Sequence, residues 1–317
     1  MASRANPVDT ATVVREALIG KKAGLRGMAF ELAMLTLLLA SLLVLVLLLA
    51  DIIGGALPTF RSRGLDFVTS SLSLNPDTAG VATGIIGSFG ISAIVALVAF
   101  PIGIGAAIYL EEYATDSAAT RFISTNIRNL AGVPSIVYGL LGLALFVRVV
   151  DLVGLGGQTS GKNVLAAGLT LAVLVLPIVI ITASEAIRAV PGSIREAGFG
   201  VGATQWEVIR HHVLPSAAPG ILTGTVLTLA RAFGETAPLI VIGVATGFFG
   251  AAANASMFDT VTGPYTALPV VVFSWSRQSV GEFADTLAPA AIVVLLFVLF
   301  IANTTAIVLR NRYDKRW

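Results

Sequence analysis

The sequence predicts an all-helical membrane protein with six transmembrane helices. Of its 317 residues, 56% are hydrophobic and 12% are charged, whereas about 25% of the residues in an ordinary soluble domain are charged. A bilayer core about 30 Å thick needs about 20 helical residues, each adding about 1.5 Å. Uncharged stretches of that length recur along the chain, and this recurrence indicates a multi-pass membrane protein.

The first predicted span is the uncharged stretch between Glu31 and Asp51. The later spans are expected at residues 81–109, 130–147, 163–184 and 219–246, and between Asp285 and Arg310. The second is longer than one straight crossing needs, and Pro101 is expected to kink or end a helix there. The fifth is placed so that Arg231 and Glu235 lie inside the bilayer.

A further uncharged stretch at residues 260–276 is short for a crossing. It contains Pro264 and Pro269, which disfavour one continuous helix. A seventh crossing would also place the basic C-terminal residues outside. We therefore expect an interfacial or re-entrant helix near the outer mouth.

The distribution of lysine and arginine predicts that both termini are cytoplasmic, because cytoplasmic flanks of membrane spans carry the excess of these residues. Fourteen of the 20 basic residues fall on the side of the termini and five on the other, with Arg231 between. The first helix should remain as an anchor, because its apolar block exceeds the roughly 7–15 residues of the apolar h-region of a signal peptide. The predicted segments are a cytoplasmic N-terminal segment at 1–29, an anchor helix at 30–53, a transmembrane domain at 80–310 with a cytoplasmic loop at 188–218, and a cytoplasmic tail at 311–317.

Composition disfavours several classes of site. The absence of cysteine excludes disulfides and thiolate metal sites, and the two histidines, His211 and His212, are adjacent and therefore poorly placed to bind one metal from a helix. Residues 156–163, GGQTSGKN, match G-x-x-x-x-G-K, but an asparagine stands where a P-loop needs a hydroxyl for magnesium. We interpret this stretch as a glycine-rich turn, and we predict no catalytic residue, no metal site and no binding of nucleic acid.

The stretch after the fourth span predicts two short helices on the cytoplasmic face. Ser193 with Glu196, and Thr204 with Glu207, have the spacing of capping boxes, in which each side chain bonds to the backbone of the other residue. Pro215 is expected to end the second helix. Glycines are expected to turn the chain between the helices, and apolar residues should face a soluble partner: Gly200, Gly202, Phe199, Val201 and Trp206.

The same loop resembles the E-A-A, three residues, G, nine residues, I-x-L-P signature of permease subunits of bacterial ABC importers. The matching residues are Glu196, Ala197, Gly198, Gly202, Leu214 and Pro215. Two positions depart from the signature, because Gly198 replaces the second alanine and His212 replaces the isoleucine. The resemblance implies the type I ABC importer permease fold, with a loop, including Trp206, that couples the permease to a separate ATPase subunit.

Three further segments resemble the permease subunits of the phosphate-specific bacterial ABC importer, most closely its A-type permease. They are residues 131–142, which contain Pro134, Ser135 and Tyr138, residues 230–239, and residues 267–275. The resemblance implies inorganic phosphate as substrate and a multi-pass location in the bacterial inner membrane. It also implies a homologous second permease, two ATPase subunits that bind ATP and Mg, and an extracytoplasmic phosphate-binding protein. The chain itself is then expected to be a transport subunit that binds no cofactor.

Arg231 and Glu235 are the candidate residues of the substrate pathway. A charge near the bilayer centre costs at least about 2.5–3.5 kcal/mol and is rarely kept without a partner or an aqueous cavity. A guanidinium suits the bidentate capture of phosphate oxygens, and a glutamate four residues later can neutralise it between passages. The alternative is a structural ion pair that fixes the fifth span to a neighbour. Pro238 is expected to break the helix beyond Glu235, which favours the pathway.

The sequence leaves other functions to consider, and it also indicates one surface for helix packing. Transport of another oxyanion is the main alternative function, and a passive channel or assembly scaffold is a less favoured one. A membrane enzyme is disfavoured, because the chain offers no convergent set of acid, base and metal ligands. Gly84, Gly87 and Gly90 form a smooth face on the second span where another helix can approach closely, and we expect the companion permease there.

Overall fold

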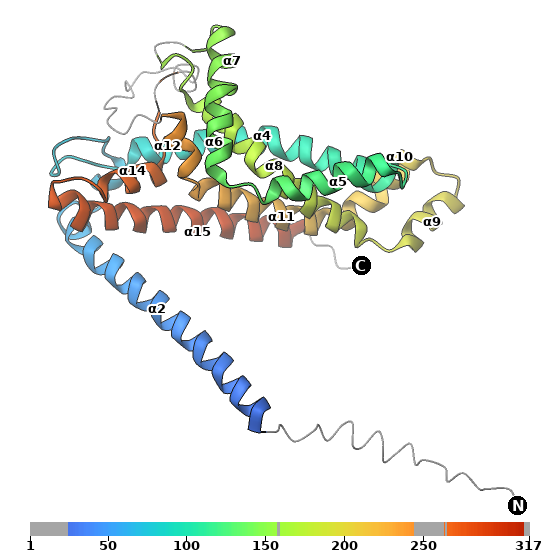
Figure 1. Cartoon of the computed structure of the whole chain (residues 1–317), viewed down its shortest axis with the longest axis horizontal. Coiled ribbons are helices and arrows are strands. Elements are labelled where there is room, and N and C mark those ends of the chain that lie inside the picture. Colours follow the sequence, from blue (N-terminus) through green and yellow to red (C-terminus); the bar gives the residue numbers. More distant parts are fainter. Residues whose placement is uncertain (1–24, 157–158, 244–262, 264, 314–317) are drawn as a thin grey trace, which may run out of the picture. The chain divides into compact units, whose positions relative to one another are not determined.

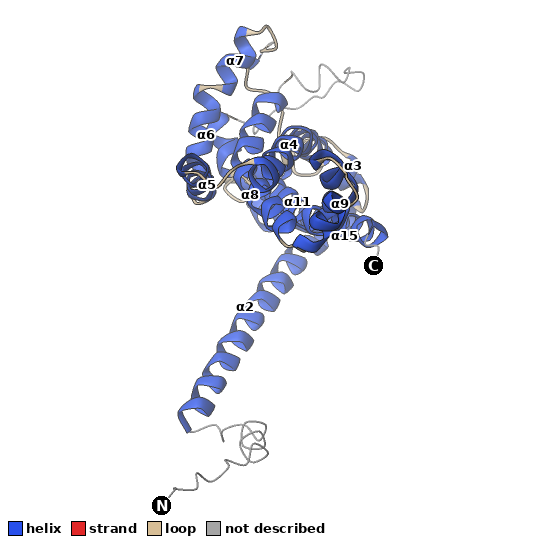
Figure 2. Cartoon of the chain, turned by 90° about the vertical axis from the view of Figure 1, so that its right-hand side faces the viewer, coloured by secondary structure: helices blue, strands red, loops and turns tan. Residues whose placement is uncertain are grey.

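The computed structural model describes residues 25–156, 159–243, 263 and 265–313, and the regular elements among them are all helices (Figures 1 and 2). The chain separates into two units, Met1–Ile52 and Ile53–Trp317. In the described part, six helical stretches are long and apolar enough to cross a membrane: Arg26–Arg63, Ala82–Tyr113, Ser135–Leu152, Val164–Arg188, Gln205–Gly234 and Phe283–Thr305. The prediction of an all-helical protein with six transmembrane helices is confirmed.

The described part of the chain contains long and short helices, some inside these stretches and some between them. The long helices are α2 (Leu25–Arg63), α4 (Ala82–Ile108), α8 (Val164–Arg188), α11 (Leu214–Gly234) and α15 (Ala288–Tyr313). The shorter helices are α3 (Asp66–Thr69), α5 (Ala118–Ala131), α6 (Ser135–Ala144), α7 (Phe146–Leu152), α9 (Gly192–Gly200), α10 (Gln205–Val208), α12 (Ala237–Ile242) and α14 (Leu268–Trp275). Three π-helical turns complete the set: η1 (Tyr109–Tyr113), η3 (Ile209–Val213) and η4 (Phe283–Leu287).

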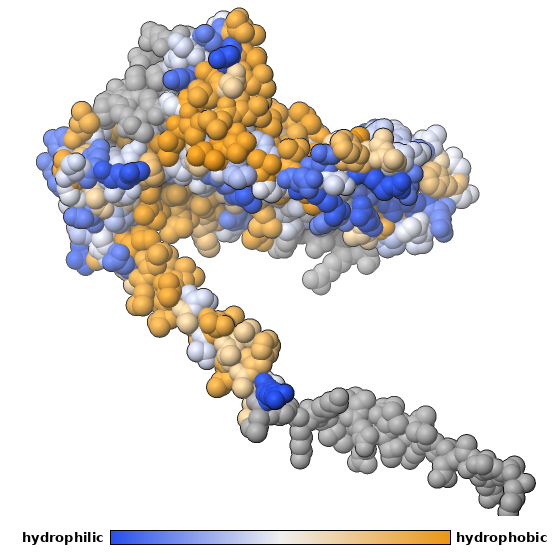
Figure 3. All heavy atoms as spheres, in the orientation of Figure 1, coloured by the Kyte–Doolittle hydropathy of each residue, from blue (hydrophilic) through white to orange (hydrophobic). Residues whose placement is uncertain are grey.

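Helix α8 is the central helix of the Ile53–Trp317 unit. Helices α4 and α11 pack along α8, and α15 packs along α11 (Figure 1). Helices α6 and α7 rise away from this bundle (Figures 1 and 2), and Figure 3 shows mostly hydrophobic atoms on their surface. Helices α9 and α10 lie at one end of the bundle, near the end of α15, whereas α12 and α14 lie at the other (Figure 1).

The third span begins later than the sequence predicted, at Ser135 instead of residue 130. Pro134 is the cap residue before α6, and α5 ends at Ala131. Proline favours the interruption of an incoming helix, because its ring clashes with the carbonyl four residues back. The chain therefore ends one helix before Pro134 and begins another after it.

Pro215 does not end the second helix of the loop, contrary to the prediction. Helix α10, the π-turn η3 and α11 follow one another without a break, so that a single helical stretch runs from Gln205 to Gly234. The carbonyl four residues before Pro215 belongs to His211, which lies in η3. A π-turn widens the helix locally and thereby accommodates the proline. A π-turn also precedes Pro289: Asp285, four residues before that proline, lies in η4.

The glycine face of α4 is covered by the chain itself, so the companion permease expected at this span would have to contact another of its faces. A Cβ on Gly87 would overlap the carbonyl oxygen of Thr266, and one on Gly84 would lie 3.3 Å from the Cα of Leu268. The backbone N–H of Leu268 also donates to the Ser88 hydroxyl at 2.8 Å. The segment that leads into α14 therefore occupies the groove that the glycines leave. Helix α14 itself is eight residues long, and it is the short non-spanning helix expected within residues 260–276.

We expect Gly87→Ala to destabilise the protein by about 2 kcal/mol or more, because overpacking typically costs about 1–3 kcal/mol and the neighbour here is backbone. Gly105→Ala is the matched control on the same helix, because a Cβ there meets nothing within 4 Å. That control should be neutral or stabilising by up to about 1 kcal/mol. Thermal unfolding of the purified variants measures both, and equal stability of the two would contradict the packing described.

Candidate functional site

The two charges predicted for the pathway do form an ion pair. The Nε atom of Arg231 lies 3.4 Å from Oε1 of Glu235, and the two side chains are 58% and 17% exposed, respectively. The fifth stretch is Gln205–Gly234 instead of 219–246, and the location of the pair inside the bilayer stays a prediction. Among the described residues, the terminal guanidinium nitrogens of Arg231 make no hydrogen bond. An accessible planar donor group remains free beside a partly covered carboxylate.

Glu235 is not on the same helix as Arg231, which corrects a further expectation. Helix α11 ends at Gly234, and Glu235 has an extended backbone. The ring of Pro238 would clash with the carbonyl four residues earlier, which is that of Gly234. The break therefore comes before Glu235 instead of beyond it, and Pro238 lies in the first turn of α12, where its missing N–H has no cost.

The three segments that carry the resemblance to phosphate permeases meet in one buried cluster. Tyr138 from the first, Ala232 and Leu239 from the second, and Ala267 and Val270 from the third belong to this cluster. The segments are far apart in sequence, so their shared patterns describe one packed region. The Arg231–Glu235 pair lies at the edge of this region, since Ala232 directly follows Arg231.

Helix α6 is fixed to the break by close backbone contact. A Cβ on Gly139 would lie 2.8 Å from the Cα of Pro238, so only glycine allows this approach. The Tyr138 hydroxyl donates to the carbonyl of Leu130 at 2.8 Å. This hydrogen bond connects α6 to the end of α5 across the interruption at Pro134.

The loop between α8 and α11 contains two short helices, as predicted, but one of their two caps differs. Thr204 and Glu207 form the expected capping box at the start of α10. Helix α9 is preceded by Pro191 and has no side-chain cap, so the box expected from Ser193 and Glu196 is absent. The reason is that α9 begins at Gly192, which places Ser193 inside the helix instead of at its cap.

The signature residues of this loop separate into packed and exposed groups. A Cβ on Gly198 would lie 2.7 Å from Val208, so glycine allows α9 to approach the start of the next helix. Gly202 has φ of 83°, a left-handed conformation that favours glycine. Several residues of the loop are exposed: Glu196, Ala197, Phe199, Val201, Trp206 and Pro215. Phe199, Val201 and Trp206 therefore expose apolar side chains, whereas a loop that only faces water would expose mainly polar ones.

Sequence reasoning missed two ion pairs at the end of α4. Glu111 pairs with Arg188 at 2.8 Å, and Glu112 pairs with Arg195 at 2.7 Å. The arginines had been counted only as signals of membrane orientation. Two adjacent glutamates at the end of a span, with Arg188 at the end of another and Arg195 in the loop that follows it, were the available signal.

Residues 156–163 form a turn between α7 and α8, with residues 157–158 outside the described part. Gly161 has φ of 82°, and the Asn163 side chain caps α8 by accepting from the N–H of Ala166 at 3.1 Å. The residue that breaks the P-loop pattern is therefore a helix cap. A helix, not a strand, precedes the turn.

Residues 99–317 match the family model described as "Binding-protein-dependent transport system inner membrane component". The chain belongs to this family. A relative named phosphate transport system permease protein PstC, from Mesorhizobium japonicum, is 32% identical over 301 residues, which cover 87% of this chain and 88% of the relative. Another, named phosphate transport system permease protein PstA, from Xylella fastidiosa strain 9a5c, is 33% identical over 253 residues, covering 78% and 82%.

A solved bacterial alginate ABC transporter, in complex with an alginate pentasaccharide-bound periplasmic protein, has the same permease fold. The TM-score is 0.57 at 16% sequence identity, and the match covers 92% of this chain and 98% of that one. The likeness supports the ABC importer permease fold expected from the loop signature.

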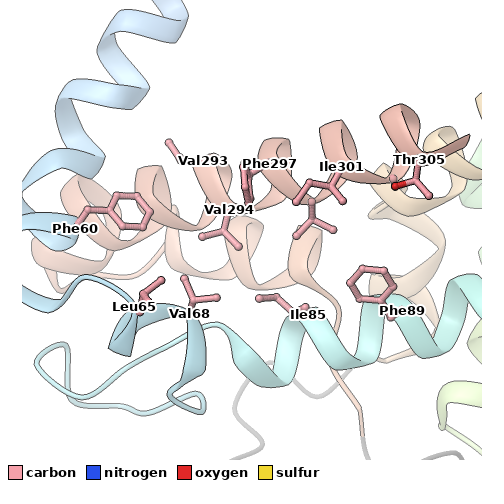
Figure 4. Close-up of a pocket in the computed structure, with 12 residues that line it drawn as sticks. Phe60, Leu65, Val68, Ile85, Phe89, Val293, Val294, Phe297, Ile301 and Thr305 are labelled. Atoms are coloured by element: carbon pink, nitrogen blue, oxygen red, sulfur yellow. The ribbon is translucent and has the colours of Figure 1, made fainter. Parts of the chain in front are cut away.

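An apolar groove in the described part of the chain lacks the charges of a phosphate site. Figure 4 shows it between α4 and α15, with a cavity volume of about 780 Å³. Its lining includes Phe60, Ile85, Phe89 and Phe297, and Thr305 is its one polar residue. The lining contains no charged residue that could bind an anion, and its apolar side chains suit contact with the membrane interior.

Two hydroxyls in the segment before α14 are buried without partners. Among the described residues, the side-chain oxygens of Tyr265 and Thr266 are inaccessible and make no hydrogen bond. Burial raises the pKa of the Tyr265 hydroxyl above its usual range, so it remains a neutral, protonated donor. A buried polar group without a partner costs about 1–3 kcal/mol.

We expect Tyr265→Phe to raise the stability of the permease by about 1 kcal/mol, because it removes an unsatisfied hydroxyl without leaving a cavity. Tyr138→Phe is the matched opposite case, because it removes a hydroxyl that donates to the Leu130 carbonyl. That variant should lose about 1 kcal/mol. Thermal unfolding in detergent measures both, and a loss of stability in Tyr265→Phe would show that its hydroxyl has a partner.

Proposed function

We propose that the chain is a permease subunit of an ATP-driven phosphate importer and forms half of the translocation pathway. The observation that carries this proposal is its similarity, over more than three quarters of its length, to relatives named as phosphate transport permeases. The Arg231–Glu235 pair supports it, because a guanidinium binds oxyanions in a bidentate manner. The same chemistry fits other oxyanions, and an importer of one of these is the alternative function.

Arg231 is proposed to bind the passing anion. Its Nε contacts Glu235 at 3.4 Å, which leaves the terminal nitrogens able to donate to two oxygens at once. Glu235 neutralises the guanidinium when no anion is present and weakens the hold on the anion when one is. The helix break before Glu235 separates the carboxylate from α11, so the carboxylate can move away from Arg231 without distorting that helix.

The loop between α8 and α11 is proposed to dock on the ATPase subunit that carries ATP and Mg. Phe199, Val201 and Trp206 are exposed there, at the end of the bundle opposite α12 and α14 (Figure 1). Aromatic residues, tryptophan above all, are enriched among the interface residues that contribute most to the binding energy. Glu196, also exposed, offers a charge at the edge of this apolar surface.

A homologous second permease and an extracytoplasmic phosphate-binding protein complete the proposed complex, with two copies of the ATPase. Exposed apolar residues on the projecting α6, including Ile136, Val137 and Leu140, are suitable for the second permease. The relatives carry both PstA and PstC names, in accord with a pair of similar permeases. The proposed location is the bacterial inner membrane, with both termini in the cytoplasm, as the basic residues favour.

We predict that Arg231→Ala reduces phosphate uptake by at least about tenfold, because one charge-assisted hydrogen bond contributes about 1.5–3 kcal/mol. Assembly with the ATPase should remain unchanged. Arg121→Ala is the control, because Arg121 forms a similar but fully exposed pair with Asp116 at 2.8 Å. Uptake of labelled phosphate by cells that depend on this importer measures the effect, and normal uptake by Arg231→Ala would exclude it from the pathway.

We predict that Glu196→Lys disrupts coupling to the ATPase, because it reverses an exposed charge within the proposed docking surface. Copurification of the ATPase with the tagged permease should fall, and the ATPase should lose its stimulation by the loaded binding protein. Arg231→Ala serves as the reciprocal control, since it should retain the ATPase. Full retention and stimulation in Glu196→Lys would place the docking surface elsewhere.

A further inference from the structure

The adjacent residues Glu111 and Glu112 form ion pairs with two different parts of the chain. Both lie in η1, directly after α4. Glu111 is bound by Arg188 from the last turn of α8, through Nε at 3.1 Å and Nη2 at 2.8 Å. Glu112 is bound by Arg195 from α9, through Nε at 3.1 Å and Nη2 at 2.7 Å. The chemistry of the two pairs is the same, but only the second reaches the loop between α8 and α11.

The Glu112–Arg195 pair is the more enclosed of the two. Glu112 is 8% exposed and Arg195 is 23% exposed, whereas Glu111 is 15% exposed and its partner Arg188 is 62% exposed. A charge pair in a shielded position is screened less by water and ions than one at the surface. Removing one partner of such a pair leaves an uncompensated charge behind and is strongly unfavourable. The pair therefore resists separation more than its neighbour does.

Further hydrogen bonds fix the same contact from several sides. Arg195 also donates to the carbonyls of Val190 and Ile187, at 2.8 and 3.0 Å. The Gln205 side chain donates to the backbone carbonyl of Glu112. Both short helices of the loop are thereby bound to one residue, α9 through Arg195 and α10 through Gln205.

The Glu112–Arg195 pair connects the loop to α4, a helix that does not directly precede or follow the loop in the chain. The chain joins the loop directly to α8 and α11, whereas Glu112 and Arg195 are 83 residues apart. A displacement of the loop reaches α8 and α11 through the backbone, whereas it reaches α4 only through non-covalent contacts, namely these side chains and the apolar cluster that contains Ala107 and Val208. At its other end, α4 contacts the segment before α14 through Gly87 and Ser88. Helix α4 thus links the loop to the opposite end of the bundle.

We propose that Glu112 and Arg195 form a clamp through which movement of the ATPase-docking loop displaces α4, so that α4 moves together with α8 and α11. Both are positioning residues, since neither touches the transported anion. The proposal rests on the docking function of the loop given above. Loss of the clamp leaves the ATPase bound and active but lets the loop move without α4.

The test compares Glu112→Gln with Glu111→Gln in the complete importer, reconstituted in liposomes with the phosphate-loaded binding protein. Both substitutions keep the side-chain shape and remove one charge. Glu112→Gln should lower the phosphate transported per ATP hydrolysed by roughly tenfold, within the usual range of coupling between sites. Glu111→Gln should change it by less than about twofold, as for other exposed pairs. Glu112→Asp, which keeps the charge, should recover part of the loss.

A second readout follows the movement itself. The chain contains no cysteine, so labels on cysteines introduced at Leu97 of α4 and Leu227 of α11, both exposed, report one distance within this chain. Trapping the ATPase with ATP and vanadate should change that distance in the wild type and in Glu111→Gln, but not in Glu112→Gln. This readout does not require the substrate to be phosphate.

The outcomes separate the two proposals. A wild-type complex that hydrolyses ATP but moves no phosphate contradicts the proposed substrate, while the distance measurement still tests the clamp. An unchanged transport ratio and an unchanged distance response in Glu112→Gln overturn the clamp. Equal losses in both variants also overturn it, because they would show that the charges only stabilise this end of the bundle. If Glu112→Gln fails to assemble, Arg195→Lys provides the same comparison with the charge retained.

Discussion

The need to satisfy every backbone polar group inside a bilayer is the constraint on which this structure depends. Unpaired N–H and C=O groups cost several kcal/mol in hydrocarbon, so a helix can be interrupted only where protein or an aqueous cavity covers the break. The break after Gly234 meets this condition, because Gly139 of α6 lies directly on Pro238 and Leu239 is buried in the common cluster. The interruption that separates Glu235 from Arg231 thus requires the packing of α6.

Charges are placed at two kinds of position, and their surroundings give them different functions. At the end of α4, Glu112 and Arg195 are mutually satisfied at 2.7 Å, and Arg195 uses its remaining donors on carbonyls. At the end of α11, Arg231 has one looser ion-pair contact among the described residues. A saturated pair holds two elements together, whereas an unsaturated cation can accept a further anion. The number of hydrogen-bond partners of each arginine therefore distinguishes the proposed mechanical role of Arg195 from the proposed anion-binding role of Arg231.

Much of the fold followed from local properties of the sequence. Hydropathy is summed over a span, so the number of spans was predicted correctly, although the bounds of the third and fifth differ. The capping box at Thr204 depends on residues three apart. Errors arose where a residue acts at a distance. Proline acts on the carbonyl four residues back, which moved the break at Gly234 and introduced the π-turn before Pro215. The partner of the Gly84–Gly87 face and the pairing of Glu112 depend on tertiary contacts between distant segments, which spacing along one chain does not reveal.

The exposure of Arg231 argues that the functional unit is larger than one chain. A guanidinium facing lipid near the bilayer centre costs at least about 2.5–3.5 kcal/mol, and a single ion pair at 3.4 Å does not offset that cost fully. Water must therefore reach Arg231, and lipid must be kept away from it. The described helices leave that side of α11 open, since Arg231 is 58% exposed. A second permease facing this surface would exclude lipid and enclose an aqueous route, so the charge proposed to bind the anion would also require the partner proposed to complete the pathway.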